Sequence, residues 1–216
     1  MSRVPLPGRR APPEATARRS LPHPGRAAQG GARGGSCSRR ENRRMPHVEV
    51  TVSTRVDDDL RACLLDLWTD VTNAGGAVGF VAPVTRDVVA PVLDGLVERV
   101  HGGTQALCVL RVDGEPAGFA VLSTSVSPLR RHWATVLRVQ VHPSRQGQGL
   151  GRVLMAGVHD AARARGLEFL HLTVRGGYGL EGFYERLGYE VFGRMPGAIR
   201  VAPGDDRDEV LLLCRL

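Results

Sequence analysis

The chain has 216 residues, a formal net charge of +7 and 29 basic residues, all of them arginine. The absence of lysine excludes a Schiff base on the protein, a pyridoxal site and a GxxxxGK(S/T) phosphate loop. No apolar run reaches the roughly 18 residues of a membrane-spanning helix. The four cysteines show neither a CxxC pair nor metal-ligand spacing, which predicts a reducing, cytoplasmic compartment and no metal site.

Residues 1–46 differ in composition from the rest of the chain. They contain 11 arginines against two glutamates, seven prolines, six glycines and no aromatic residue. Such a segment cannot bury enough surface to order itself, so we predict a disordered leader followed by one domain over residues 47–216. A transit peptide, a tail that binds nucleic acid, and a true start at Met45 remain alternatives. Nucleic-acid binding by the rest of the chain is not expected, since its charge is slightly negative.

The periodicity of apolar residues predicts the first elements. Alternation at Val48, Val50 and Val52 indicates a strand. Two apolar lines at helical spacing follow, over residues 60–71 and 89–100, and the first of them includes Cys63. Both helices should therefore pack one face against a sheet.

The second half alternates strands and helices. Strands are predicted over residues 106–112, 117–123, 134–141, 169–174, 189–193 and 210–213, and helices over residues 150–161 and 179–187. A turn-rich stretch, residues 196–208, should join the last two strands. The order β-α-α-β-β-β-α-β-α-β-β indicates an α/β fold with a mixed sheet, antiparallel in the middle and covered by helices on both faces.

The most informative segment is the glycine-rich loop after the strand at residues 134–141. Gly147, Gly149 and Gly151 precede a helix, whose free N–H groups and positive dipole end favour phosphate. A dinucleotide-binding GxGxxG motif is a poorer match, because the spacing here is GxGxG and the loop does not open a βαβ unit. A glycine turn that only packs is the remaining alternative.

Two motifs resemble the GNAT family of N-acetyltransferases. The family's acetyl-CoA loop, Q/R-x-x-G-x-G/A, is matched by Gln146, Gly149 and Gly151, and its aromatic–Tyr pair before L-G-F/Y is matched by residues 183–189. The resemblance covers roughly residues 47–216, and the last 24 residues resemble actinobacterial members. It implies a sheet of about seven strands that splays open at the acetyl-CoA site.

The resemblance also implies roles for individual residues. Tyr184 would be the general acid that protonates the departing thiolate, although a tyrosine at this position could instead only pack in the core. The N–H of Val141 would stabilise the developing oxyanion. The residues implied in acetyl-CoA binding are Val139, Gln140, Val141, Arg145, Gln146, Gly147, Gln148, Gly149, Leu150, Gly151 and Arg152.

The sequence does not identify a general base. The strand before the loop carries no carboxylate, and Gly177 occupies a position where the family often has asparagine. Ordered water is the favoured route for deprotonation. The weaker candidates are His142, His132, Glu181 and Glu185.

The acceptor pocket is expected between residues 73–80 and the turn at residues 196–208. An acidic group in or beside that turn could attract a cationic amine, or could simply be solvated: Asp205, Asp206, Asp208 and Glu209. Trp133 and Tyr178 could line the pocket or pack elsewhere.

These features predict a cytoplasmic, acetyl-CoA-dependent N-acetyltransferase that acts by direct transfer on a primary amine of a small molecule or peptide. A non-catalytic acyl-CoA-binding module is the alternative. The resemblance makes a homodimer plausible, and no membrane partner is expected.

Overall fold

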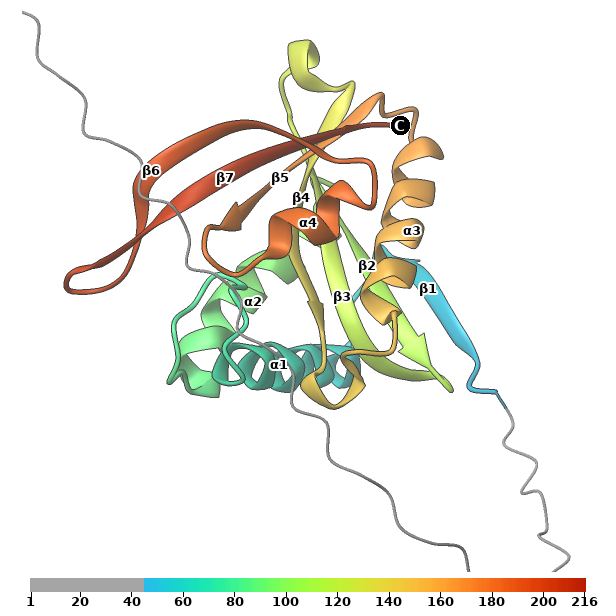
Figure 1. Cartoon of the computed structure of the whole chain (residues 1–216). Helices are drawn as coiled ribbons and strands as arrows, with labels where there is room; N and C mark the ends of the chain where they lie inside the picture. Colours follow the sequence, from blue (N-terminus) through green and yellow to red (C-terminus); the bar gives the residue numbers. More distant parts are fainter. Residues whose placement is uncertain (1–44) are drawn as a thin grey trace, which may run out of the picture. The chain divides into compact units, whose positions relative to one another are not determined.

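The structure is a computed structural model that describes residues 45–216; the predicted disordered leader lies almost entirely outside the described residues. The described residues form one seven-stranded sheet with the order β1-β2-β3-β4-β5-β7-β6 (Figure 1). All neighbouring strands are antiparallel except β4 and β5. The strands are β1 (Val48–Ser53), β2 (Gln105–Val112), β3 (Glu115–Thr124), β4 (Trp133–Val141), β5 (Phe169–Arg175), β6 (Glu190–Ala202) and β7 (Asp205–Arg215).

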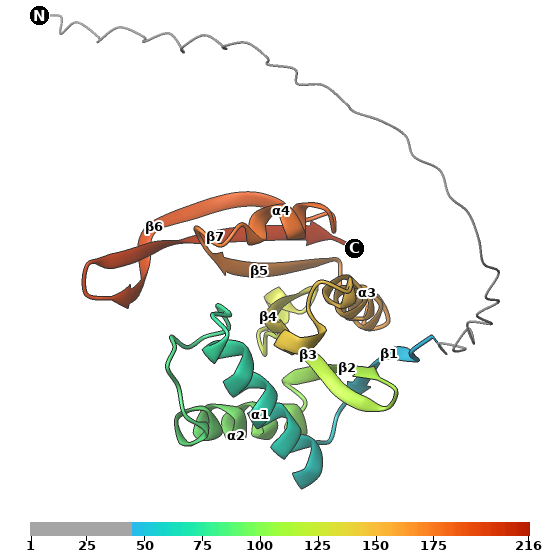
Figure 2. The same cartoon turned by 60° about the horizontal axis from the view of Figure 1, so that its bottom comes forward.

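Four α-helices cover the two faces of the sheet, in the predicted order. They are α1 (Asp58–Asn73), α2 (Arg86–His101), α3 (Leu150–Arg163) and α4 (Leu180–Glu185). The N-terminus of α1 is capped as its acidic start suggests, since Asp57 Oδ1 accepts a hydrogen bond from the Leu60 N–H at 2.8 Å. Helices α1 and α2 lie together on one side of the strands, and α3 lies on the other (Figures 1 and 2).

The sheet separates two apolar cores. Leu64, Trp68 and Leu93, from α1 and α2, pack with Phe119 on one face of the sheet. On the opposite face, α3 and α4 pack against alternate residues of the same strands. The mixed α/β fold expected from the sequence is therefore confirmed.

Two details of the sequence prediction are wrong. Cys63 is exposed, whereas Cys108 and Cys214 are buried. The buried face of α1 turns toward Leu65 and Thr69 and leaves Cys63 outside.

The second correction concerns residues 196–208, which are mostly strand and not a connecting turn. Strands β6 and β7 continue through this region as one long hairpin, with irregular register between Met195 and Ile199. Pro196 is tolerated there because β6 is an edge strand and is bulged at this point.

A close approach of α3 to β1 gives a stability prediction. A Cβ added to Gly157 would lie 2.5 Å from the Val50 side chain, whereas one added to Gly95 in α2 would meet only the flexible end of Arg99. We expect Gly157→Ala to lower the free energy of unfolding by about 1–3 kcal/mol through overpacking. Gly95→Ala, the matched control, should raise it by up to about 1 kcal/mol through helix propensity. Urea unfolding of both variants measures the difference, and an equal sign for the two would contradict it.

Candidate active site

The strands β4 and β5 separate soon after they meet. They pair in parallel only over residues 133–135 and 169–171. Beyond these pairs, the edge of β4 that faces β5 has no strand partner among the described residues. The N–H of His142 donates to the Ala117 carbonyl of β3 at 2.8 Å. Because N–H groups alternate along a strand, the N–H of Val141 points to the open edge.

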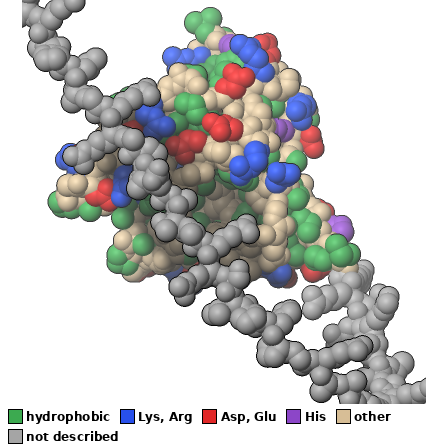
Figure 3. Space-filling view, viewed as in Figure 1, with side chains coloured by type: hydrophobic (Ala, Val, Ile, Leu, Met, Phe, Trp, Pro, Cys, Tyr) green, Lys and Arg blue, Asp and Glu red, His purple; other side chains and the backbone are tan. Residues whose placement is uncertain are grey.

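The separation opens a cavity of about 910 Å³. Figure 3 shows a shaded hollow in this face of the molecule, with mostly backbone and uncharged atoms in view. One end of the cavity is lined by the glycine-rich loop and α4, and the other by residues 76–81 of the α1–α2 loop with the ends of β5 and β7. The volume suits a ligand of several hundred daltons with room beside it.

The glycine-rich loop presents free backbone donors to this cavity. Gly147 and Gly149 have φ angles of 75° and 77°, and no atom lies within 4 Å of the place where either Cβ would be. Within residues 45–216, no acceptor takes a hydrogen bond from the N–H groups of residues 147–151. Gly149 is also the N-cap of α3, so the positive end of the helix dipole adds to these donors. The arrangement is a cradle for a phosphate group.

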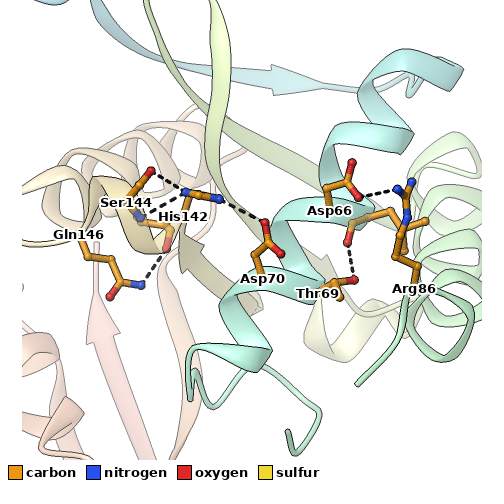
Figure 4. A network of polar contacts seen from close by, with 9 residues as sticks. Asp66, Thr69, Asp70, Arg86, His142, Ser144 and Gln146 are labelled. Atoms are coloured by element: carbon orange, nitrogen blue, oxygen red, sulfur yellow. Dashed lines mark hydrogen bonds and ion pairs between the residues drawn. The ribbon is translucent and has the colours of Figure 1, made fainter. Parts of the chain in front are cut away.

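Side chains fix this loop to the strand and to α1. Gln146 Nε2 donates to the Val141 carbonyl at 2.9 Å. His142 Nδ1 lies 2.8 Å from Ser144 Oγ, and His142 Nε2 lies 3.4 Å from Asp70 Oδ2 (Figure 4). The loop therefore has its shape before any ligand binds.

Most of the residues expected to bind acetyl-CoA line the cavity. Arg145 and Gln148 do not, because Arg145 is exposed and Gln148 Nε2 turns back to the Ser144 carbonyl at 3.5 Å. The nine that line it are Val139, Gln140, Val141, Gln146, Gly147, Gly149, Leu150, Gly151 and Arg152.

Tyr184 lines the same cavity from α4. It is 6% exposed, and its hydroxyl makes no hydrogen bond with the described residues. Its ring packs edge-on against Phe183 and Tyr189, with ring centroids 5.0 and 5.6 Å away. Burial raises the pKa of the Tyr184 phenol, so the group stays protonated at neutral pH.

None of the four candidates for a general base lines the cavity. His142 bonds to Asp70, Glu181 Oε1 lies 3.6 Å from Arg194 Nη2, Glu185 is exposed, and His132 packs on Phe169. Glu209, which the sequence suggested only as part of an acidic group near the acceptor, lines the cavity from β7. The sequence signal that could have identified Glu209 is strand alternation, which places it on the face opposite the buried residues of the last strand.

The other acidic residues expected at the acceptor pocket are neutralised by arginines. Asp205, Asp206 and Asp208 form ion pairs with Arg207, Arg200 and Arg194. They are therefore poorly suited to attract a cationic amine. Of the two aromatic candidates, Tyr178 lines the cavity, whereas Trp133 does not and stacks on Phe169 with ring centroids 5.7 Å apart.

Residues 45–216 contain neither a cluster of metal-ligating side chains nor a membrane-spanning helix. No three His, Cys, Asp or Glu side chains are grouped there to hold a metal ion. None of the helices in this part has the length and apolar character needed to cross a membrane.

Sequence comparisons relate the chain to known proteins. The model of the acetyltransferase (GNAT) family matches residues 64–189. An N-acetyltransferase from Azospirillum brasilense, from the hisH–hisA intergenic region, is 37% identical over 120 residues, or 52% of this chain and 66% of that protein. Streptothricin acetyltransferase from Streptomyces lavendulae is 44% identical over 77 residues, or 36% of this chain and 39% of that protein. The matches thus span less than two thirds of either relative.

A structural comparison agrees with the family match. A protein from Salmonella typhimurium, solved with its cofactor acetyl-CoA, superposes with a TM-score of 0.61 at 21% identity, covering 77% of this chain and 94% of that one. At this level of identity the similarity concerns the fold.

Proposed function

Because the chain belongs to the GNAT family of acetyltransferases, we propose that it transfers an acetyl group from acetyl-CoA to a primary amine of a small molecule or peptide. The observation that carries the proposal is the run of N–H groups at residues 147–151, which have no acceptors within the described chain and belong to the loop and helix start that line the cavity. They fit the diphosphate of coenzyme A, and the open edge of β4 fits its amide-containing arm.

The thioester of acetyl-CoA supplies the activated acyl group, and the protein supplies position and charge stabilisation. Backbone groups of residues 139–141 orient the pantetheine arm. The N–H of Val141, which points to the open edge, donates to the carbonyl oxygen as negative charge develops there. Arg152, at the rim, adds positive charge near the phosphates.

Tyr184 supplies the proton in the proposed reaction. The neutral amine forms the new C–N bond while the C–S bond breaks, and the phenol of Tyr184 protonates the departing sulfur. The amine loses its own proton to water or to Glu209, which is the carboxylate that lines the cavity.

A thiol-release assay with acetyl-CoA and a panel of primary amines tests the proposal. We expect amine-dependent release of coenzyme A, together with an upward shift of the melting temperature when coenzyme A is added. Absence of both would contradict the proposal. Thermal stabilisation by coenzyme A without thiol release on any amine would favour the second candidate, a non-catalytic acyl-CoA-binding module, for which the missing carboxylate on β4 is the motivating observation.

Three further proposals accompany this function. We infer that the catalytic domain comprises residues 47–216, that the protein acts in the cytoplasm, and that a small molecule is favoured over a peptide as the acceptor. Sedimentation would test the homodimer that the family resemblance implies.

A further inference from the structure

Two arginines converge on the end of the cavity that lies away from the glycine-rich loop. Arg138, on β4, places its guanidinium 5.3 Å from the ring centroid of Trp68 and against Gly79, where a Cβ would collide with it. Arg175, at the end of β5, donates from Nη2 to the Phe80 carbonyl at 3.3 Å. The two guanidinium groups therefore contact neighbouring residues of the same α1–α2 loop, and both arginines line the cavity.

Neither guanidinium has a carboxylate partner within residues 45–216, although every nearby aspartate of the β6–β7 hairpin has an arginine partner. Arg175 Nε is buried and makes no hydrogen bond with a described residue. Burial and then the neighbouring charge of Arg99 lower the pKa of Arg138. Both arginines are partly buried and lack a counter-ion among the described residues, so this end of the cavity favours an anion.

A third polar group in the cavity wall is also unsatisfied. Gln140 is 4% exposed, and neither its amide oxygen nor its amide nitrogen has a hydrogen-bond partner in the described chain. It follows Arg138 by two residues on β4, between the arginine end and the open edge near Val141. A buried primary amide without partners fits a ligand that both donates and accepts hydrogen bonds.

We propose that the acceptor is an amine that also carries a carboxylate, such as an amino acid, and that Arg138 and Arg175 bind this carboxylate beside Gly79 and Phe80. The proposal rests on the proposed acetyl transfer and adds the class of its acceptor. Gln140 and Glu209 face the same cavity and supply acceptors for the amine. The carboxylate neutralises the two guanidinium groups, and its position directs the amine toward Val141 and Tyr184.

The arrangement argues against two other occupants of this end. The two guanidinium groups would repel a polycationic acceptor. Of the four acidic residues at 205–209, only Glu209 lines the cavity and could offset this repulsion. The phosphates of coenzyme A are expected to bind at the opposite end, where residues 147–151 offer free N–H groups.

The first test compares amino acids with their own amides as acceptors, at equal concentrations of the neutral amine. The amide has nearly the same shape but lacks the negative charge, and an NH2 donor replaces one acceptor oxygen. We expect kcat/KM to be at least about tenfold higher for the acids, the effect of one or two charge-assisted hydrogen bonds. Equal values for acids and amides would overturn the proposal.

The second test uses Arg138→Gln and Arg175→Gln, with the exposed Arg130→Gln as a matched control outside the cavity. Each cavity variant should lower kcat/KM for the acids about tenfold and for the amides less than about threefold. Arg130→Gln should change neither. A variant that only disturbed the fold would lower both alike, and that outcome contradicts the proposal, as does a matching loss of coenzyme A affinity.

A binding measurement separates this proposal from the proposed catalysis. Trp68 lies under Arg138, so its fluorescence reports on that end of the cavity. We expect N-acetyl amino acids to change the fluorescence of the coenzyme A complex in wild type and not in Arg138→Gln, whereas N-acetyl amino acid amides bind weakly to both. Carboxylate-dependent binding without thiol release would support the anion site and reject the catalysis; no carboxylate dependence would reject the anion site.

Discussion

Gly149→Val should raise the KM for acetyl-CoA by about 30-fold or more. Gly149 has a φ of 77°, which a β-branched residue adopts only at a cost of about 1–2 kcal/mol. Its Cβ would also enter open space at the N-terminus of α3, where the free N–H groups face the cavity. Loss of one charge-assisted hydrogen bond adds about 1.5–3 kcal/mol, and 2 kcal/mol alone corresponds to about 30-fold in affinity.

Gly103→Val is the matched control for this prediction. Gly103 has nearly the same φ, 75°, and also has no atom within 4 Å of its Cβ position, but it lies in the turn between α2 and β2, outside the cavity. Both variants should lose similar stability in urea, and only Gly149→Val should lose affinity for acetyl-CoA in steady-state kinetics and calorimetry. An equal rise of the KM for acetyl-CoA in both variants would show that backbone strain, and not the N–H groups of the loop, controls binding.

The elements that the sequence predicted correctly, and the motifs from which the site is proposed, are local in the chain. Gln146, Gly149 and Gly151 lie within six residues, and the strand before them and the helix after them follow from apolar periodicity alone. Tyr184 is likewise set by a short motif on one short helix. The order of the elements could be predicted for the same reason, because each helix and strand carries its own pattern.

The features that could not be predicted depend on long-range contacts. Arg175 meets the Phe80 carbonyl across 95 residues of sequence, so nothing local indicates that it shares a cavity end with Arg138. The acidic residues at 205–208 could have attracted a cationic amine or simply been solvated, because their ion pairs were not visible in the sequence. Asp206 and Asp208 pair with Arg200 and Arg194 across the β6–β7 hairpin, and the proline and glycines near residue 196 had indicated a loop there. Pairing in space therefore leaves these three aspartates poorly suited to attract a cation.

The ion pairs of these aspartates also affect the choice of the general base. Once Asp205, Asp206 and Asp208 are paired with arginines, Glu209 is the acidic residue of the four that remains to act in the cavity. It lies opposite Arg175 in the β5–β7 register. A carboxylate and a guanidinium on neighbouring strands can hold the two ends of a zwitterion, which links the proton acceptor to the proposed substrate class.

Tyr184→Phe should lower kcat by about 100- to 1000-fold and change the KM for acetyl-CoA less than about threefold. Tyr184 lines the cavity, and its hydroxyl makes no hydrogen bond with residues 45–216, so its removal leaves no orphaned partner in the fold. The melting temperature of Tyr184→Phe should therefore equal that of the wild type. What is lost is the proton for the departing sulfur, which matters only as the C–S bond breaks and so affects turnover more than binding.

Tyr189→Phe is the control, because Tyr189 packs edge-on against Tyr184 but does not line the cavity. Its hydroxyl lies 3.2 Å from His159 Nε2, so the variant should lose about 1 kcal/mol of stability and keep its kcat. Since burial raises the pKa of Tyr184, the phenol stays protonated below about pH 10. We expect the rate to rise with pH as the amine loses its proton, and Tyr184 does not contribute to that rise. That rise should persist in Tyr184→Phe at a lower rate. An unchanged kcat, or an equal loss in both variants, would exclude Tyr184 as the acid.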